Sequence, residues 1–208
     1  MKEINKIKIL SRKSNLAVIQ AYQVGNKIQE YFPNIKIEYV NKSTKGDIDL
    51  KTPLSEMEST GVFTDDLRND LIDNKCDLAV HSWKDLPLDL GSDTVLAGTL
   101  KRADQRDILF IKKKSQENIQ KNKSIKILSS SPRRIYNLKT FIKNYLPFNL
   151  KKIQFENIRG NIPSRFKFFL EGNCDGLVMA KAAVDRLLDN NIEEFNEIAL
   201  KMKKNIEQ

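Results

Sequence analysis

Serine and arginine side chains gather at one predicted strand-to-helix junction, residues 129–134, whose sequence is SSSPRR. Ser131 can cap a helix that begins at Pro132. Free backbone N–H groups, hydroxyl groups and two guanidinium groups would then point to one place, as in an anion-binding site. The alternative is a well-capped surface helix with two solvated arginines.

Two further segments place arginine at the end of a predicted strand. Arg159 and Arg165 flank a predicted turn and helix start in the sequence RGNIPSR, and Arg12 lies beside Ser14 in the first strand–helix turn. Arginine binds carboxylate and phosphate groups through two parallel hydrogen bonds, so both segments are candidate anion sites. Taken singly, each could also be an ordinary loop with a solvated arginine.

A carboxylate stands among basic and aromatic side chains in residues 81–87, HSWKDLP. Asp85 could form a structural ion pair, or it could stabilise a positive charge that develops on a substrate. A Ser–His–Asp hydrolase is not indicated, because no nucleophile-elbow motif is present and His81 could simply pack. The sequence has no P-loop and no dinucleotide-binding glycine motif. One histidine and two distant cysteines do not predict a metal site.

Short strands and helices alternate along the chain and place these segments at strand ends. In the first half we expect strands over 7–10, 35–40, 77–80 and 94–99, helices over 15–31 and 62–74, and a polar connection over 41–60. In the second half we expect strands over 107–111, 125–129, 152–156 and 176–180, and helices over 132–145, 161–171 and 181–189. The alternation predicts an α/β fold with parallel sheets, which bind ligands at the carboxyl ends of the strands.

The same pattern predicts two α/β lobes with a hinge near residues 101–106 and a ligand cleft between the lobes. The first lobe covers 1–100, the second covers 101–190, and 191–208 forms a basic helical tail. The whole chain has a formal net charge of +9, and residues 101–208 carry 23 Lys+Arg against 12 Asp+Glu. This excess indicates an anionic partner for the second half.

Composition argues against several classes of protein. The 208 residues are 40% hydrophobic, which is more than a disordered chain of this charge would have. No apolar run is long enough to span a bilayer, and the first residues lack the apolar region of a secretory signal. Two cysteines cannot form a disulfide framework, so we expect a protein of the reducing cytoplasm. We also expect a monomer.

Five segments together resemble the porphobilinogen deaminase (hydroxymethylbilane synthase) family: LSRKSNLA, TKGDIDLKTPL, DLAVHSWKDLP, SSSPRR and NIRGNIPSR. They occur in the family's order and approximate spacing, over about residues 6–190. The resemblance implies two lobes like those of periplasmic binding proteins. It also implies a transferase of porphyrin and haem biosynthesis, which deaminates porphobilinogen and joins the pyrroles head to tail into a linear tetrapyrrole. Its partners would be porphobilinogen and oligopyrrole intermediates, without membrane or nucleic acid.

The resemblance also implies roles for individual residues. Asp85 would be the catalytic carboxylate, which contacts pyrrole N–H groups and stabilises the cation formed when ammonia leaves. Phe63 would lie near the cleft, below a mobile loop. Basic and polar residues would bind the carboxylates of substrate and cofactor: Arg12, Ser14, Lys84, Ser129, Ser131, Arg133, Arg134, Arg159, Arg165 and Arg186. No metal is implied.

Two departures from the family pattern bear on its cofactor, dipyrromethane. The family has a third α+β domain whose cysteine holds this primer as a thioether, and we expect that domain to be absent here. Cys76 and Cys174 both precede predicted strands, and we expect buried structural thiols, which leaves the primer non-covalently held, attached to an unexpected residue, or absent. Residues 56–61, EMESTG, stand where the family has a glycine-rich, lysine-bearing lid.

Three functions remain open at this stage. A shortened deaminase is favoured by the retention of Asp85 and of the arginine motifs. A non-catalytic binding protein for pyrrole carboxylates is favoured by the expected loss of the cysteine domain. Nucleic-acid binding is supported by charge alone, without a recognised motif or an aromatic stacking platform.

Overall fold

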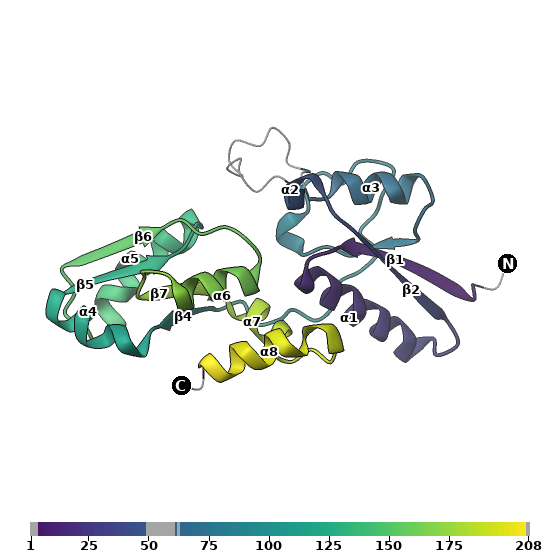
Figure 1. Ribbon diagram of the computed structural model, residues 1–208. Coiled ribbons are helices and arrows are strands. Elements are labelled where there is room, and N and C mark those ends of the chain that lie inside the picture. Colours follow the sequence, from purple (N-terminus) through teal and green to yellow (C-terminus); the bar gives the residue numbers. More distant parts are fainter. Residues whose placement is uncertain (1–3, 49–60, 62, 207–208) are drawn as a thin grey trace. The chain divides into compact units, whose positions relative to one another are not determined.

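The computed structural model describes residues 4–48, 61 and 63–206. The chain divides into two compact units, Met1–Lys101 and Arg102–Gln208, which are described one after the other (Figure 1). Both units combine a sheet with flanking helices, so the predicted α/β fold class is confirmed.

The first unit contains a parallel sheet in the order β2-β1-β3. Its strands are β1 (Lys6–Arg12), β2 (Lys36–Lys42) and β3 (Leu78–Ala79), and its helices are α1 (Asn15–Tyr31), α2 (Lys45–Ile48) and α3 (Asp65–Ile72). A single 3-10 turn, Trp83–Asp85, follows β3. Figure 1 shows α1 and α3 on opposite faces of this sheet.

The central strand β1 is covered on both faces, and its residues Ile9 and Leu10 are buried. Because the three strands are parallel, their carboxyl ends meet at one edge of the sheet. This edge carries Arg12 at the end of β1, α2 after β2, and the Trp83–Asp85 turn after β3. The fold of the first unit therefore brings three separate segments to one place.

The second unit contains a four-stranded mixed sheet in the order β4-β7-β5-β6. Its strands are β4 (Asp107–Ile111), β5 (Ser124–Leu128), β6 (Lys152–Glu156) and β7 (Gly176–Ala180). Its helices are α4 (Gln116–Asn122), α5 (Pro132–Tyr145), α6 (Ile162–Glu171), α7 (Lys181–Leu188) and α8 (Glu193–Ile206), with a 3-10 turn over Lys113–Ser115. Strand β5 runs parallel to β6 and β7, whereas β4 is antiparallel to β7.

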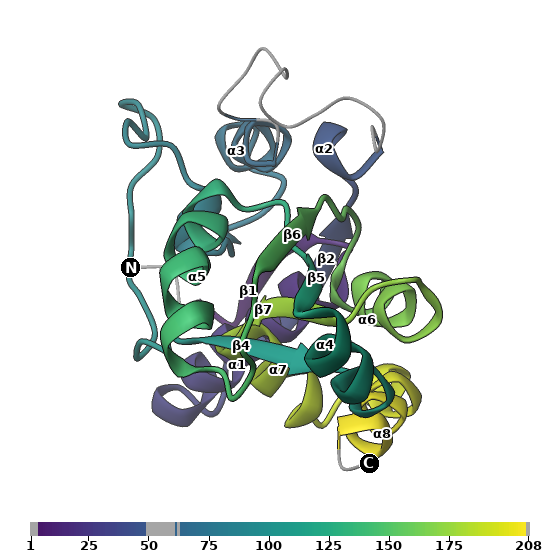
Figure 2. The ribbon, with the colours of Figure 1, turned by 90° about the vertical axis from the view of Figure 1, so that its left-hand side faces the viewer.

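Helices cover both faces of this second sheet. On one face, Ile127 of β5 packs in a buried cluster with Ile119 of α4 and Ile142 of α5. On the other face, the Phe110 ring of β4 meets the Phe166 ring of α6 edge to face, with 5.8 Å between the ring centroids. Figure 2 shows α5 and α6 on opposite sides of the strands. The alternation of side chains along each strand accounts for the two layers.

Several features of the described residues differ from the sequence-based expectations, among them the short helix α2 inside the expected connection over 41–60. The strand expected over 94–99 is wrong, because this segment has no regular structure, and Val95 is 85% exposed. A strand needs a neighbour for its backbone hydrogen bonds, and none of the described strands pairs with this segment. The short helix α4 was not expected from its polar sequence. The sequence also predicted parallel sheets, but strand β4 runs antiparallel to its neighbour β7.

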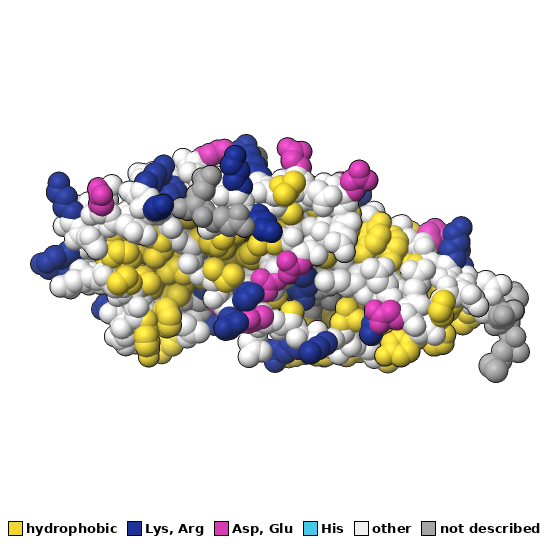
Figure 3. Space-filling model, turned by 90° about the horizontal axis from the view of Figure 1, so that it is seen from below, with side chains coloured by type: hydrophobic (Ala, Val, Ile, Leu, Met, Phe, Trp, Pro, Cys, Tyr) yellow, Lys and Arg dark blue, Asp and Glu magenta, His cyan; other side chains and the backbone are white. Residues whose placement is uncertain are grey.

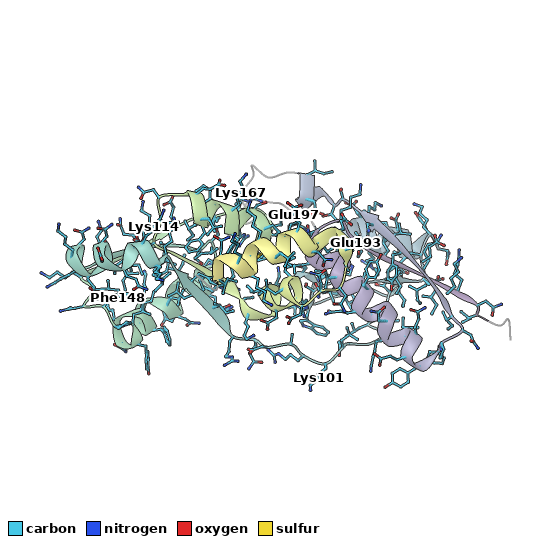
Figure 4. All side chains as sticks on the ribbon, turned by 60° about the horizontal axis from the view of Figure 1, so that its bottom comes forward. Lys101, Lys114, Phe148, Lys167, Glu193 and Glu197 are labelled. Carbon is cyan, nitrogen blue, oxygen red and sulfur yellow. The ribbon has the colours of Figure 1, made fainter. Side chains whose placement is uncertain are left out.

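Helix α8 packs against α7, with Phe195, Ala199 and Met202 buried. A surface pocket of about 250 Å³ between α6 and α8 has a mainly apolar lining that includes Phe166 and Met202. Figure 3 shows hydrophobic side chains gathered at the surface of the second unit. Figure 4 shows Lys167 on α6, beside α8. An apolar pocket of this kind does not suit the anions predicted from the sequence.

Each helix within the described ranges is too short or too polar to cross a membrane.

Candidate active site

The first cluster lies at the carboxyl end of β1, where Arg12 faces two carboxylates. Its Nε donates to Asp47 Oδ2 at 3.1 Å and its Nη2 donates to Asp47 Oδ1, while its Nη1 lies 3.7 Å from Asp85 Oδ2. The guanidinium carbon lies 4.1 Å from the centre of the Phe63 ring. The structure thus brings together Arg12, Phe63 and Asp85, which the sequence analysis selected, and adds Asp47.

Asp85 is positioned by the 3-10 turn after β3. The turn is closed by a hydrogen bond from Asp85 N–H to the Ser82 carbonyl (2.9 Å), and Ser82 Oγ donates to Gln20 Oε1 of α1 (2.8 Å). Lys84 Nζ donates to Asp85 Oδ1 at 2.9 Å, but the Lys84 side chain is 81% exposed. A carboxylate can accept about four hydrogen bonds. Asp85 therefore keeps the capacity to accept N–H groups from a ligand.

His81 lies beside this cluster and is partly buried. Burial lowers the pKa of His81, the positive charge of Arg12 lowers it further, and Asp85 opposes both effects. The imidazole is therefore neutral at pH 7, which agrees with a packing role and leaves the positive charge of the cluster to Arg12 and Lys84.

The second cluster lies at the carboxyl ends of β5 and β6. The Ser131 hydroxyl caps α5 by accepting from Arg134 N–H (3.5 Å), so the predicted cap is confirmed. The buried Ser129 hydroxyl accepts from Ser131 N–H (3.4 Å). Ser130 Oγ donates to the carbonyl of Ile158 and accepts from its N–H, both at 2.6 Å. These bonds tie the start of α5 to the segment that follows β6.

Asp107, the first residue of β4, is the counter-ion of two arginines on α5. Its carboxylate accepts from Arg134 Nε at 2.9 Å and lies 3.6 Å from Arg133 Nη2. Arg134 is 18% exposed, whereas Arg133 is 67% exposed. Of the two, Arg134 is therefore the more rigidly held.

The turn before α6 orients the side chain of Arg165, which lies in the first part of that helix. Gly160 has a φ of +98°, a conformation that side chains with a Cβ rarely adopt, and its carbonyl accepts from Arg165 Nε at 2.8 Å. Asn161 caps α6 by accepting from Ser164 N–H (3.0 Å). Glycine and asparagine thus fix the direction in which the Arg165 side chain leaves the helix.

Three guanidinium groups of this unit act on one another. Burial lowers the pKa of Arg165, and the positive charges of Arg134 and Arg159 lower it further. An anion bound among them would relieve this repulsion. The cluster of Arg134, Arg159 and Arg165, with the hydroxyls of Ser129 and Ser131 nearby in sequence and structure, therefore suits a carboxylate ligand.

Two further predicted residues lie at the start of α1 and on α7. Ser14 stands at the N-cap position of α1, but its side chain makes no capping hydrogen bond. Arg186 lies on α7, where burial lowers its pKa and the adjacent Asp185 opposes the effect. The segment 56–61 lies, apart from Gly61, outside the described residues.

Cys76 and Cys174 are both free and buried, which confirms the prediction for these thiols. Burial raises the pKa of each thiol. Cys174 Sγ also donates to the carbonyl of Phe169 at 3.6 Å. Buried thiols that resist ionisation are poor nucleophiles, so neither suits covalent attachment of a cofactor.

The sequence analysis missed Asp47 and Asp107, which orient the arginines. Thr44 and Asp47 show the spacing of a helix-capping box in the sequence TKGD, and this signal could have marked Asp47 as a fixed carboxylate. No comparable signal marks Asp107. In the described part of the chain, no group of three or more His, Cys, Asp or Glu side chains could hold a metal ion.

Comparison with known proteins agrees with these motifs. The family model described as "Porphobilinogen deaminase, dipyromethane cofactor binding domain" matches residues 7–206. A probable porphobilinogen deaminase of Picrophilus torridus is 39% identical over 185 residues, which cover 88% of this chain and 61% of that protein. A probable porphobilinogen deaminase of Thermoplasma volcanium is 40% identical over 182 residues, covering 88% and 57%. That of Chlamydia trachomatis is 39% identical over 181 residues, covering 87% and 70%.

The chain thus spans less than two thirds of the length of the first two of these relatives. The family model, by contrast, takes in all the strands of both units apart from the first residue of β1. It also takes in both clusters, from Arg12 to Arg165. On these grounds the chain belongs to the porphobilinogen deaminase family.

Proposed function

We propose that this chain acts as a hydroxymethylbilane synthase-like transferase, which deaminates porphobilinogen and joins the pyrroles head to tail into a linear tetrapyrrole. The observation that carries the proposal is the Asp85 carboxylate, which is 16% exposed, lies beside Arg12 and keeps free acceptor capacity. The curated relatives are named porphobilinogen deaminases, and we take from these names the reaction in which Asp85 would act.

The proposed role of Asp85 is electrostatic. When the protonated amino group on the aminomethyl arm of porphobilinogen leaves as ammonia, the methylene carbon and the ring remain as an azafulvenium. Its positive charge is shared with the pyrrole N–H. A carboxylate that accepts this N–H stabilises the charge, and the limited exposure of Asp85 reduces screening by water. The free carbon of the acceptor pyrrole then attacks the cation, and its proton leaves.

The basic residues would bind the acetate and propionate groups of the pyrroles. In the first unit these are Arg12, Ser14 and Lys84. In the second unit they are Ser129, Ser131, Arg133, Arg134, Arg159, Arg165 and Arg186. The mutual repulsion among Arg134, Arg159 and Arg165 supports this assignment, because bound carboxylates would offset it. Phe63 would limit the cleft beside Arg12.

The second cluster also fits the family's cofactor, dipyrromethane, because acid side chains match a set of guanidinium and hydroxyl groups. The residues that would hold it are Arg134, Arg159, Arg165, Ser129 and Ser131. When bound, dipyrromethane supplies the pyrrole carbon to which the first porphobilinogen is joined. Because Cys76 and Cys174 are buried, we expect dipyrromethane to be bound through these polar groups rather than through a bond to either thiol.

We further propose that the two units correspond to the two lobes of the family, over 1–100 and 101–190, arranged as in periplasmic binding proteins around a cleft. Both units carry their polar clusters at carboxyl ends of strands, as ligand-binding α/β lobes do. The polar stretch 101–106, which lacks regular structure, would be the hinge. The tail over 191–208 would remain with the second lobe, and the protein would be a cytoplasmic monomer.

Incubation of the purified protein with porphobilinogen tests the proposal, with the tetrapyrrole followed by its absorbance after oxidation. We expect turnover by the wild type, with and without added dipyrromethane primer, and a loss of about 100-fold or more in Asp85→Ala. Asp93→Ala is the matched control, because Asp93 also lies 3.7 Å from an arginine of the first unit, Arg68. Intact-protein mass spectrometry would show any covalent primer.

A wild type that consumes no porphobilinogen even with added primer would refute the transferase. Binding of porphobilinogen without turnover, measured by calorimetry, would instead support the alternative of a non-catalytic binding protein for pyrrole carboxylates. If Asp85→Ala and Asp93→Ala lost turnover to the same extent, the proposed role of Asp85 would be refuted.

A further inference from the structure

Two carboxylates share Arg12, and Asp47 is by far the more firmly held. Besides both bonds from Arg12, Asp47 Oδ2 accepts from the N–H of Thr44 at 3.1 Å and from its Oγ1 at 2.8 Å. Thr44 is buried, and its carbonyl accepts from Asp47 N–H (2.9 Å) and Ile48 N–H (3.2 Å). The start of α2 therefore fixes the Asp47 carboxylate from one side, and Arg12 fixes it from the other.

The charge of Asp47 is stable across the neutral range. Burial opposes its ionisation and is the largest single influence, but the hydrogen bonds from Arg12 and Thr44 together outweigh it and lower the pKa of Asp47 below its usual value. Asp47 therefore carries its negative charge beside Arg12 at neutral pH.

Asp85 is held more loosely. Its distance of 3.7 Å from Arg12 Nη1 exceeds that of a hydrogen bond, and its contact with the exposed Lys84 is a surface ion pair of small effect. If Asp47 no longer held Arg12, the guanidinium would be drawn to Asp85, the other carboxylate near it among the described residues. A closed Arg12–Asp85 pair would use the oxygens that a pyrrole N–H needs.

We propose that Asp47 is a positioning residue, which holds the Nε and Nη2 edge of Arg12 and thereby keeps the Asp85 carboxylate available to the substrate. The consequence for turnover rests on the proposed function, whereas the restraint on Arg12 is a property of the first unit alone. Phe63, with its ring 4.1 Å from the guanidinium carbon, supports the same orientation from the face of the guanidinium.

A double-mutant cycle tests the proposal in turnover. Asp47→Ala should lower kcat by about 10- to 100-fold, as expected when a reacting group is misplaced by about 1 Å. In an Arg12→Ala background the same change should cost less than about twofold, because the residue that Asp47 restrains is gone. A purely structural role at the start of α2 would give equal losses in both backgrounds and would overturn the proposal.

Two further variants separate this effect from misfolding. Asp47→Asn keeps the shape and an oxygen that can accept from Thr44, so it should fold normally and show a smaller loss of kcat. Asp70→Asn is the matched control, because Asp70 is a buried residue of the first unit whose carboxylate pairs with two lysines. It should leave kcat unchanged.

The signal of the Arg12 Nε–H group in a ¹H–¹⁵N NMR spectrum gives a readout that does not depend on turnover. We expect this signal to move in Asp47→Ala and Asp47→Asn, and to stay in place in Asp70→Asn; Arg12→Lys would assign it. An unmoved signal in Asp47→Ala would overturn the positioning role. If the wild type proves inactive, the proposed function fails, while this spectrum still decides whether Asp47 orients Arg12.

Discussion

Gly160 is the position where one added methyl group should disturb the second cluster most. Its φ of +98° is strained for alanine, and a Cβ there would lie 3.2 Å from the Cβ of Ser164. Strain of this kind costs about 1–3 kcal/mol. If the turn relaxed instead, the Gly160 carbonyl would move away from Arg165 Nε and lose a charge-assisted hydrogen bond worth about 1.5–3 kcal/mol. By either route, Gly160→Ala should lower the free energy of unfolding by about 1–3 kcal/mol.

Gly98→Ala is the matched control for this change. A Cβ at Gly98 would meet nothing within 4 Å, and its φ lies outside the range that strains alanine. Its unfolding free energy should therefore stay the same or rise by up to about 1 kcal/mol, because alanine restricts the unfolded chain. Urea unfolding followed by circular dichroism gives both values, and hydrogen exchange should place the loss in Gly160→Ala within residues 156–172. A loss below about 0.5 kcal/mol, or equal effects at both glycines, would refute the reasoning.

Three further outcomes are expected. Burial lowers the pKa of His81 in the folded protein below its ordinary value of 6.5. Its contribution to stability is therefore present above pH 6.5 and is lost as the pH falls through the folded pKa. The unfolding free energy of the wild type should therefore fall more steeply below pH 6.5 than that of His81→Gln, and equal slopes would contradict the burial of His81. Cys76 and Cys174 should react slowly with a thiol reagent in the native protein and rapidly in urea, whereas rapid native reaction would show that they are accessible. Lys112→Met should lower the unfolding free energy by about 1.5–3 kcal/mol, because the buried Lys112 Nζ donates to the Gly172 carbonyl at 2.6 Å; an unchanged urea midpoint would contradict this.

Elements whose signals lie within their own residues could be predicted from the sequence. Helix α5 occupies the expected 132–145, because Ser131 supplies the cap and Pro132 the first position, both local properties. The expected strand over 94–99 is the opposite case. It contains a short apolar run from Val95 to Ala97. A strand forms only where a neighbour completes its hydrogen bonds, and an apolar run does not specify that neighbour. The direction of β4 also depends on β7, since one pattern suits parallel and antiparallel pairing alike.

The candidate site divides in the same way. Arg12 and Asp85 were predicted because they stand in short motifs with recognisable residue types. Asp47 and Asp107 were not, because their importance comes from a partner far along the chain: 35 positions separate Arg12 from Asp47, and 27 separate Asp107 from Arg134. A capping signal shows where a helix starts, but it does not show which arginine the capping carboxylate will meet.

The pairing of β4 with β7 has a consequence for how the second unit is made. Along the chain, β4 is the first strand of this sheet and β7 is the last, although the two are neighbours within the sheet. During synthesis, β4 therefore has no partner strand until β7 has left the ribosome. The chain between β4 and β7 forms a long loop, but each doubling of loop length adds only about 0.6 kcal/mol to the entropic cost of closing it. The time before β4 pairs with β7 is therefore set by the speed of translation. Asp107 begins β4 and is the counter-ion of Arg133 and Arg134. During biosynthesis, therefore, these two arginines would acquire their counter-ion only at the last step of sheet assembly.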